Sequence, residues 1–179
     1  MKGMVFTEFL EMVEDKFGYD MVDDIIESSD LPSGGSYTAV GTYSHAEIVQ
    51  LVVNLSEKSG IGIPVLLHTF GKHLFGQFAK GYKHFFTASK DSFDFLGGIE
   101  NYIHVEVKKL YPDAELPTFD IERISDQELR MVYHSDRRMA DFAEGLIDGC
   151  GEHYNENLTV SRESENADGS EVVFRIVRG

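Results

Sequence analysis

The sequence is poor in cysteine and in positive charge, and each shortage excludes a class of protein. The single cysteine, Cys150, excludes an internal disulfide and a zinc site built from several cysteines. A lone thiol also suits a reducing compartment, so we expect a cytoplasmic protein. Only 16 Lys and Arg stand against 31 Asp and Glu, which gives a formal net charge of −15. This balance argues against nucleic acid and anionic membranes as main partners, because both bind basic surfaces.

Long apolar runs and the usual enzyme fingerprints are missing as well. No run approaches the length of a transmembrane helix, and Glu8 and Glu11 interrupt the apolar N-terminus, so we predict neither membrane insertion nor a signal peptide. There is no nucleophile elbow, phosphate-binding loop, dinucleotide motif or HExxH sequence. Apolar residues nevertheless make up 42% of the 179 residues, and they include 13 Phe and 8 Tyr. We therefore expect one folded domain with an aromatic-rich core.

The period of the apolar residues divides the chain into two parts. Up to about Leu110 they recur at helical spacing, and the predicted helices are bounded by signals such as the Ser44–Glu47 capping box. The last of these helices is predicted to run from Ser92 to about Leu110, with the Gly97-Gly98 pair as an interruption. After Pro117 the pattern alternates and predicts two hairpins separated by a helix, over 118–125, 129–135, 138–154, 158–163 and 171–177. We predict an α+β fold with a helical N-terminal part followed by a β-β-α-β-β part.

Tyr133, Ser135 and Arg137 alternate with other residues, so in an extended chain their side chains point to one side. A phenol, a hydroxyl and a guanidinium then donate several hydrogen bonds from one face. Such an array suits two carboxylates or a phosphate, because a guanidinium binds oxyanions through two parallel hydrogen bonds. The alternative is an ordinary strand end whose polar side chains face water.

His104 lies beside the apolar stripe of the last predicted helix, a short distance after the Gly97-Gly98 pair. Two glycines weaken a helix, but they let a flat and bulky group approach the backbone. His104 then either ligates a metal or cofactor from one side or is a boundary residue bonded to a carbonyl. The spacing of the seven histidines excludes the usual zinc-binding helix and leaves both alternatives open.

In their order along the chain, several short motifs resemble the haem-nitric oxide/oxygen binding (H-NOX) family, which includes the haem domain of soluble guanylate cyclase. They are Met1-Lys2-Gly3, Phe70-Gly71, Ile103-His104, Leu116-Pro117 and Tyr133-x-Ser135-x-Arg137. The resemblance covers nearly the whole chain. It implies one sensor domain over residues 1–179 around a buried haem b, with a helical N-terminal subdomain over 1–60 and a haem-ligating subdomain over 61–179.

The resemblance also implies roles for particular residues. His104 is similar to the proximal ligand of the haem iron, and Pro117 to the proline that presses on the porphyrin and distorts it. The side chains that resemble the clamp on the two haem propionates are Tyr133, Ser135 and Arg137. Those that resemble the wall of the distal pocket are Val5, Phe9, Leu74, Phe78, Phe142 and Leu146.

One departure from the family pattern concerns the choice of gas. Oxygen-binding members carry a distal tyrosine at the position that matches Phe142. Bound oxygen is polarised and gains from a hydrogen-bond donor, whereas nitric oxide needs one far less. An apolar pocket therefore predicts a domain that selects nitric oxide over oxygen; carbon monoxide is a further expected ligand.

The resemblance implies a sensor and not an enzyme. Nitric oxide is expected to weaken the iron–His104 bond and release the helix that carries it, with Gly71 as a possible hinge. The expected receiver is a separate signalling protein, such as a histidine kinase or a cyclic-di-GMP enzyme. Three alternatives stay open: a peroxidase-like haem enzyme, an oxygen-binding member of the family, and a haem-free module that uses Arg137 for another anion.

Overall fold

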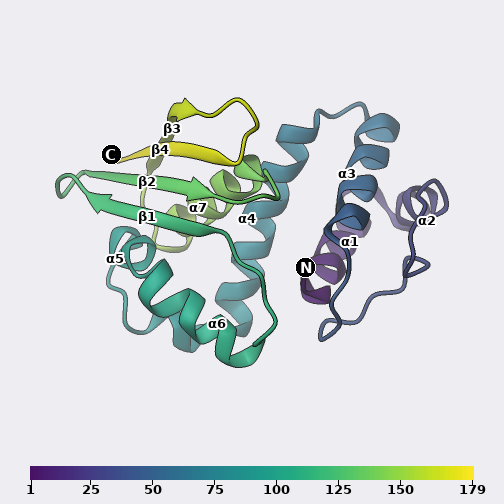
Figure 1. Ribbon diagram of the computed structural model, residues 1–179, viewed down its shortest axis with the longest axis horizontal. Helices are drawn as coiled ribbons and strands as arrows, with labels where there is room; N and C mark the ends of the chain where they lie inside the picture. The colour runs from purple at the N-terminus through teal and green to yellow at the C-terminus, as the bar shows by residue number, and fades with distance from the viewer.

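The computed structural model describes all 179 residues and has helices in its N-terminal part and a sheet in its C-terminal part (Figure 1). The helices are α1 (Gly3–Phe17), α2 (Tyr19–Glu27), α3 (His45–Ser59), α4 (Ile63–Gly81), α5 (Ser92–Gly97), α6 (His104–Leu110) and α7 (Ala140–His153), with a 3-10 turn η1 (Lys83–Phe86) and a π-helical segment η2 (Ile99–Ile103). The strands are β1 (Thr118–Arg123), β2 (Glu128–His134), β3 (Leu158–Glu165) and β4 (Glu171–Arg178). This order confirms the predicted α+β fold. No helix is both long and apolar enough to cross a bilayer.

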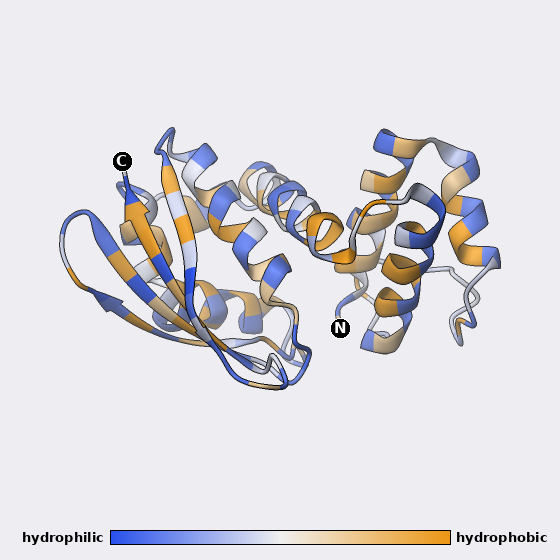
Figure 2. Cartoon of the chain, turned by 90° about the horizontal axis from the view of Figure 1, so that it is seen from above, coloured by the Kyte–Doolittle hydropathy of each residue, from blue (hydrophilic) through white to orange (hydrophobic).

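The four strands form one antiparallel sheet in the order β1-β2-β4-β3. Alternate residues of β2, namely Leu129, Met131 and Tyr133, are buried, which follows from the two-residue period of a strand with one covered face. Helix α7 lies against the sheet in Figure 1, and the same alternation appears as bands along the strands in Figure 2. The predicted β-β-α-β-β order thus buries one face of the sheet under α7.

Two apolar clusters make up the core, and α4 contributes to both. The first joins α1, α2 and α3 to α4 through residues such as Phe9, Leu51 and Phe70. The second joins the sheet to α5 and α7, and Phe75 is the α4 residue within it. Helix α4 therefore connects the N-terminal helices to the sheet, and in Figure 1 it runs between them.

Two glycines bring the backbones of α4 and α7 together. A Cβ atom on Gly71 would lie 2.2 Å from the carbonyl oxygen of Phe142, and one on Gly145 would lie 2.0 Å from that of His68. Both glycines are buried, so neither helix can accommodate a side chain at these points without moving. Gly71 is thus a point of close helix packing, and its role as a hinge stays a prediction.

We expect Gly145→Ala to lower the free energy of unfolding by about 1–3 kcal/mol, because the added methyl group overpacks the contact between α4 and α7. Gly76→Ala is the matched control, since a Cβ on this helical glycine meets nothing within 4 Å. Alanine at position 76 is expected to raise the free energy of unfolding by about 0.5–1 kcal/mol through helix propensity. Urea denaturation of both variants measures the difference. Equal effects of the two substitutions would contradict the close packing at Gly145.

The predicted helix from Ser92 to about Leu110 is present as three consecutive helical segments, and the first division lies at the predicted Gly97-Gly98 interruption. Helix α5 ends at Gly97, and the π-helical segment η2 precedes α6. The carbonyl oxygen of Gly98 accepts hydrogen bonds from the N–H groups of Tyr102 (2.9 Å) and Ile103 (3.2 Å), so the turn is wider than in an α-helix. Single π turns are frequent at functional sites, and this one ends directly at His104.

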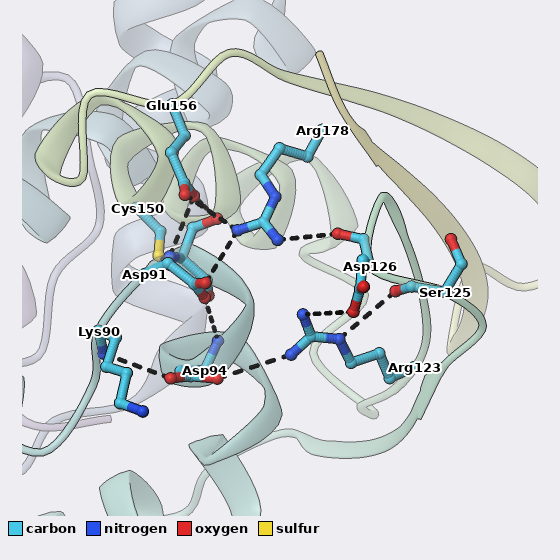
Figure 3. Close-up of polar contacts among 10 residues, drawn as sticks. Lys90, Asp91, Asp94, Arg123, Ser125, Asp126, Cys150, Glu156 and Arg178 are labelled. Carbon is cyan, nitrogen blue, oxygen red and sulfur yellow. Dashed lines mark hydrogen bonds and ion pairs between the residues drawn. The ribbon is translucent and has the colours of Figure 1, made fainter.

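A network of ion pairs fixes the beginning of α5 to the sheet (Figure 3). The Arg178 guanidinium lies 2.9 Å from the Glu156 carboxylate and 3.0 Å from that of Asp91, and Asp91 caps α5 by accepting from the N–H of Asp94. Arg178 also donates to the carbonyl oxygen of Asp126, in the turn between β1 and β2. These contacts hold one end of the segment that leads to His104.

Candidate functional site

His104 is the first residue of α6, and its two ring nitrogens have different surroundings. Nδ1 lies 3.0 Å from a carboxylate oxygen of Glu100, while Nε2 has no hydrogen-bond partner in the protein. The side chain is only 16% exposed. Burial lowers the pKa of His104 below its usual value, although the Glu100 carboxylate acts in the opposite direction. The neutral imidazole is therefore favoured at neutral pH, and this is the form that ligates metals.

An aromatic row connects His104 to the strand of the Tyr-x-Ser-x-Arg motif. The ring centroid of Phe119 lies 6.1 Å from that of His104 and 5.7 Å from that of Tyr133. Phe119 and Tyr133 are also paired across β1 and β2. Pro117, half-buried, comes directly before β1 and two residues before Phe119. The histidine and the motif thus lie near the same end of the sheet, where β1 begins and β2 ends.

The expectation of an extended chain from Tyr133 to Arg137 is wrong beyond His134, where β2 ends. A turn follows, in which the Ser135 hydroxyl accepts from the N–H of Arg137 (3.2 Å) and the Tyr133 hydroxyl accepts from that of Met139 (3.0 Å). Arg138 has φ +55°, in the left-handed region that lets the chain reverse before α7. Both hydroxyls accept from backbone, so their own protons stay available for a further acceptor.

Arg137 already binds a carboxylate. Its guanidinium donates to the Glu115 carboxylate (2.9 Å) and to the carbonyl oxygen of the same residue (3.0 Å). The Glu115 side chain is 84% exposed, and exposed pairs of this kind contribute little free energy. An open hollow of about 590 Å³ adjoins the turn and is lined almost entirely by polar residues, Ser135 and Arg137 among them. The lining also contains the carboxylates of Glu115, Asp136 and Glu171, so Arg137 is the group in this hollow whose charge suits a carboxylate of a bound molecule.

The side chains of the expected distal wall come together from three helices. Phe9 and Leu74 are buried in the first cluster, and four half-buried side chains pack against it: Val5, Phe78, Phe142 and Leu146. The ring of Phe70 meets that of Phe9 edge-on, with centroids 5.2 Å apart, and lies tilted against that of Phe142, with centroids 5.0 Å apart. Leu146 also packs against the second cluster, which contains Tyr133. These six residues form an apolar cluster over α1, α4 and α7, in which Phe9 and Leu74 are fully covered and the other four are partly exposed.

Two acidic residues of the site, Glu100 and Glu115, lie outside the motifs found in the sequence. Glu100 lies four residues before His104. This spacing places two side chains on one face of a helix, so the sequence could have indicated that Glu100 contacts His104. Glu115 lies 22 residues before Arg137, and nothing in the local sequence indicates that the two side chains pair.

Outside the site, the side chain of Glu47 does not complete the capping box expected at the start of α3. It is buried and accepts from the Tyr37 and Ser33 hydroxyls instead.

These residues fit a planar, mostly apolar metal macrocycle that carries carboxylates, such as haem. An imidazole with its Nε2 free offers the iron a ligand, and the half-buried apolar side chains suit a flat ring system. Arg137 and the two hydroxyls offer donors to carboxylates, and the guanidinium already holds one. The site therefore has the chemistry of a haem-binding domain.

Comparison with known proteins agrees with this class. The model of the haem-NO-binding family matches residues 2–162, so the chain belongs to this family. No curated protein shows a significant match. The resemblance to H-NOX domains that the sequence motifs indicate is thereby confirmed.

Several solved H-NOX proteins share the fold. The Fe(II) unliganded protein from K. algicida is 46% identical with a TM-score of 0.96, and the match covers 100% of this chain and 97% of that one. The protein from Shewanella woodyi, bound to IWP-051 in the Fe(II)CO state, is 48% identical with a TM-score of 0.85, over 100% and 95% of the two chains. An S. oneidensis H-NOX in the Fe(II)NO state is 24% identical with a TM-score of 0.93, and the match covers 100% of this chain and 99% of that one. At this identity the match shows the shared fold.

Proposed function

We propose that this chain is a haem-based sensor that binds nitric oxide at ferrous haem and passes the signal to a separate protein. The observation that carries the proposal is the His104 imidazole, whose Nδ1 is bound by Glu100 while Nε2 has no partner. Membership of the haem-NO-binding family supports it. Haem b is the proposed cofactor, and when bound it supplies the iron that takes up the gas.

Different residues of the chain are proposed to bind different parts of the haem. We infer that His104 ligates the iron, that Tyr133, Ser135 and Arg137 bind the propionates, and that Pro117 presses on the ring. The proposed wall of the gas pocket consists of Val5, Phe9, Leu74, Phe78, Phe142 and Leu146. Residues 1–179 then act as a single domain, with 1–60 as its helical subdomain and 61–179 as its haem-ligating one.

Nitric oxide is the proposed physiological ligand, with carbon monoxide as a second one. All six residues of the proposed wall are apolar, so none can donate a hydrogen bond to a polarised gas. The S. woodyi relative, 48% identical, was solved in the Fe(II)CO state, which supports carbon monoxide binding. The same apolar wall lacks the acid–base pair that a peroxidase needs, and we propose that the chain is not itself an enzyme.

The proposed output is a movement of α6 that a partner recognises. A partner protein can respond to this movement only if its affinity for one position of the helix is higher than for the other. We propose a histidine kinase or a cyclic-di-GMP enzyme in the cytoplasm as that partner. The net charge of −15 favours a partner with a basic docking surface, since complementary charge speeds association.

The test is an absorbance spectrum of the reduced, haem-loaded protein under argon, in air and with nitric oxide. We expect a five-coordinate ferrous spectrum that air leaves unchanged and nitric oxide shifts. A stable complex in air would make the protein an oxygen binder. A protein that takes up no haem would contradict the proposal and favour a module that binds another anion at Arg137.

A further inference from the structure

The Glu100 carboxylate lies between the imidazole of His104 and the backbone of β1. One of its oxygens, Oε1, is 3.0 Å from His104 Nδ1 and also accepts a 2.9 Å hydrogen bond from the N–H of Phe119. The Glu100 side chain is 31% exposed and that of His104 is 16% exposed. The carboxylate is thus shared between a helix and a strand and is largely shielded from water.

This contact determines which ring nitrogen of His104 carries the proton. An ionised carboxylate can only accept hydrogen bonds, so Nδ1 must donate its hydrogen to Glu100. In a neutral imidazole the lone pair is then on Nε2, the nitrogen without a protein partner. The arrangement prepares Nε2, and no other atom of the ring, for a metal.

The second hydrogen bond of Glu100 makes it more than a helix-surface pair. Glu–His neighbours on a helix ordinarily stabilise it by a few tenths of a kcal/mol and rotate freely. Here the N–H of Phe119 holds the same oxygen, and Phe119 is paired with Tyr133 across β1 and β2. The position of the imidazole is therefore tied through one oxygen atom to β1, which pairs with the strand that leads into the Tyr133–Arg137 turn.

We propose that Glu100 is a positioning residue that holds His104 with Nε2 toward the iron, strengthens the iron–nitrogen bond and couples that bond to β1. The proposal rests on the proposed function, because it requires His104 to be the ligand. A carboxylate that accepts from Nδ1 makes the ring a stronger electron donor, which is the usual effect of such partners on metal-bound histidines. A movement of His104 must then break its own hydrogen bond to Glu100, break the Glu100–Phe119 hydrogen bond, or pull on β1.

The first test is resonance Raman spectroscopy of the reduced, haem-loaded Glu100→Gln variant. Glutamine keeps the shape and the acceptor oxygen but removes the charge, so we expect the iron–His104 stretching frequency to decrease. Glu106→Gln is the matched control, because Glu106 lies on α6 two residues from His104 and pairs with Lys109 at 2.5 Å. Its frequency is expected to equal that of the unmodified protein. For Glu100→Ala we expect haem to bind about tenfold or more weakly.

The second test needs no substitution. In the diamagnetic carbon monoxide form, NMR is expected to show the His104 Nδ1 proton shifted downfield and protected from exchange. A proton at the ordinary position, or a stretching frequency unchanged in Glu100→Gln, would overturn the role of Glu100. Either result leaves the sensor proposal intact if His104→Gly still changes the haem spectrum. An unchanged spectrum in His104→Gly would instead remove the proposed ligand itself.

Discussion

Replacing His104 with glycine is expected to weaken haem binding by roughly a hundredfold or more, because the variant loses the ligand itself and not only an outer partner. The imidazole is the group whose Nε2 has no bond within the protein, so no other contact replaces it. Adding free imidazole to the variant is expected to restore haem binding, since the substitution leaves space where the ring stood. Titration of the apoprotein with haem, followed by absorbance, measures both effects.

His68→Gly is the matched control for this result. His68 also lies in a helix and pairs with a carboxylate, with its Nε2 2.8 Å from Asp148. Its loss costs the same helix propensity, about 1 kcal/mol, but is expected to leave haem affinity unchanged. If His104→Gly bound haem as tightly as His68→Gly does, His104 would not be the ligand.

The second large effect is expected from Phe142→Tyr, which adds one hydroxyl to the proposed gas pocket. Phe142 is half-buried on α7, and its ring lies 5.0 Å from that of Phe70 within the apolar wall. Hydrogen bonds to charged groups contribute about 1.5–3 kcal/mol, which corresponds to roughly a tenfold to hundredfold gain in oxygen affinity. We expect the reduced variant to form an oxygen complex in air, while its nitric oxide binding changes little.

Phe142→Leu separates the hydroxyl from the change in packing. Leucine alters the shape of the wall without adding a donor, so this variant is expected to remain insensitive to air. Absorbance spectra of both variants at stepped oxygen pressures make the comparison. An oxygen complex in the leucine variant, or none in the tyrosine variant, would show that distal polarity does not decide the choice of gas.

Much of the fold was predictable because it depends on local pattern. Helical spacing and stop residues such as Gly18 and Gly60 predict α1 to α4, and the change to alternation after Pro117 predicts both hairpins. The family is predictable for a similar reason, because its motifs are short and keep their order. The roles of the motif residues in haem binding remain proposals.

The π-helical segment and the turn after β2 were not predictable in the same way. Gly97-Gly98 signals a weak helix, but only the hydrogen bonds of Gly98 to Tyr102 and Ile103 show how the chain continues. Likewise, the alternating pattern predicts an extended conformation at Ser135. Only the hydrogen bond from the N–H of Arg137 to the Ser135 hydroxyl shows that the chain turns there. In both places the local sequence does not select one conformation by itself, and the hydrogen bonds of the folded chain do.

The sequence by itself determined most of the elements, the family and the candidate site residues, because period and motif are properties of neighbouring residues. These candidates are His104, Tyr133, Ser135 and Arg137. Only the tertiary structure decided which groups these side chains meet. Glu100 is bound to Phe119 and Arg137 to Glu115, over separations of 19 and 22 residues. Such partners depend on how helices and strands approach one another in space, and a one-dimensional pattern carries no information about that approach.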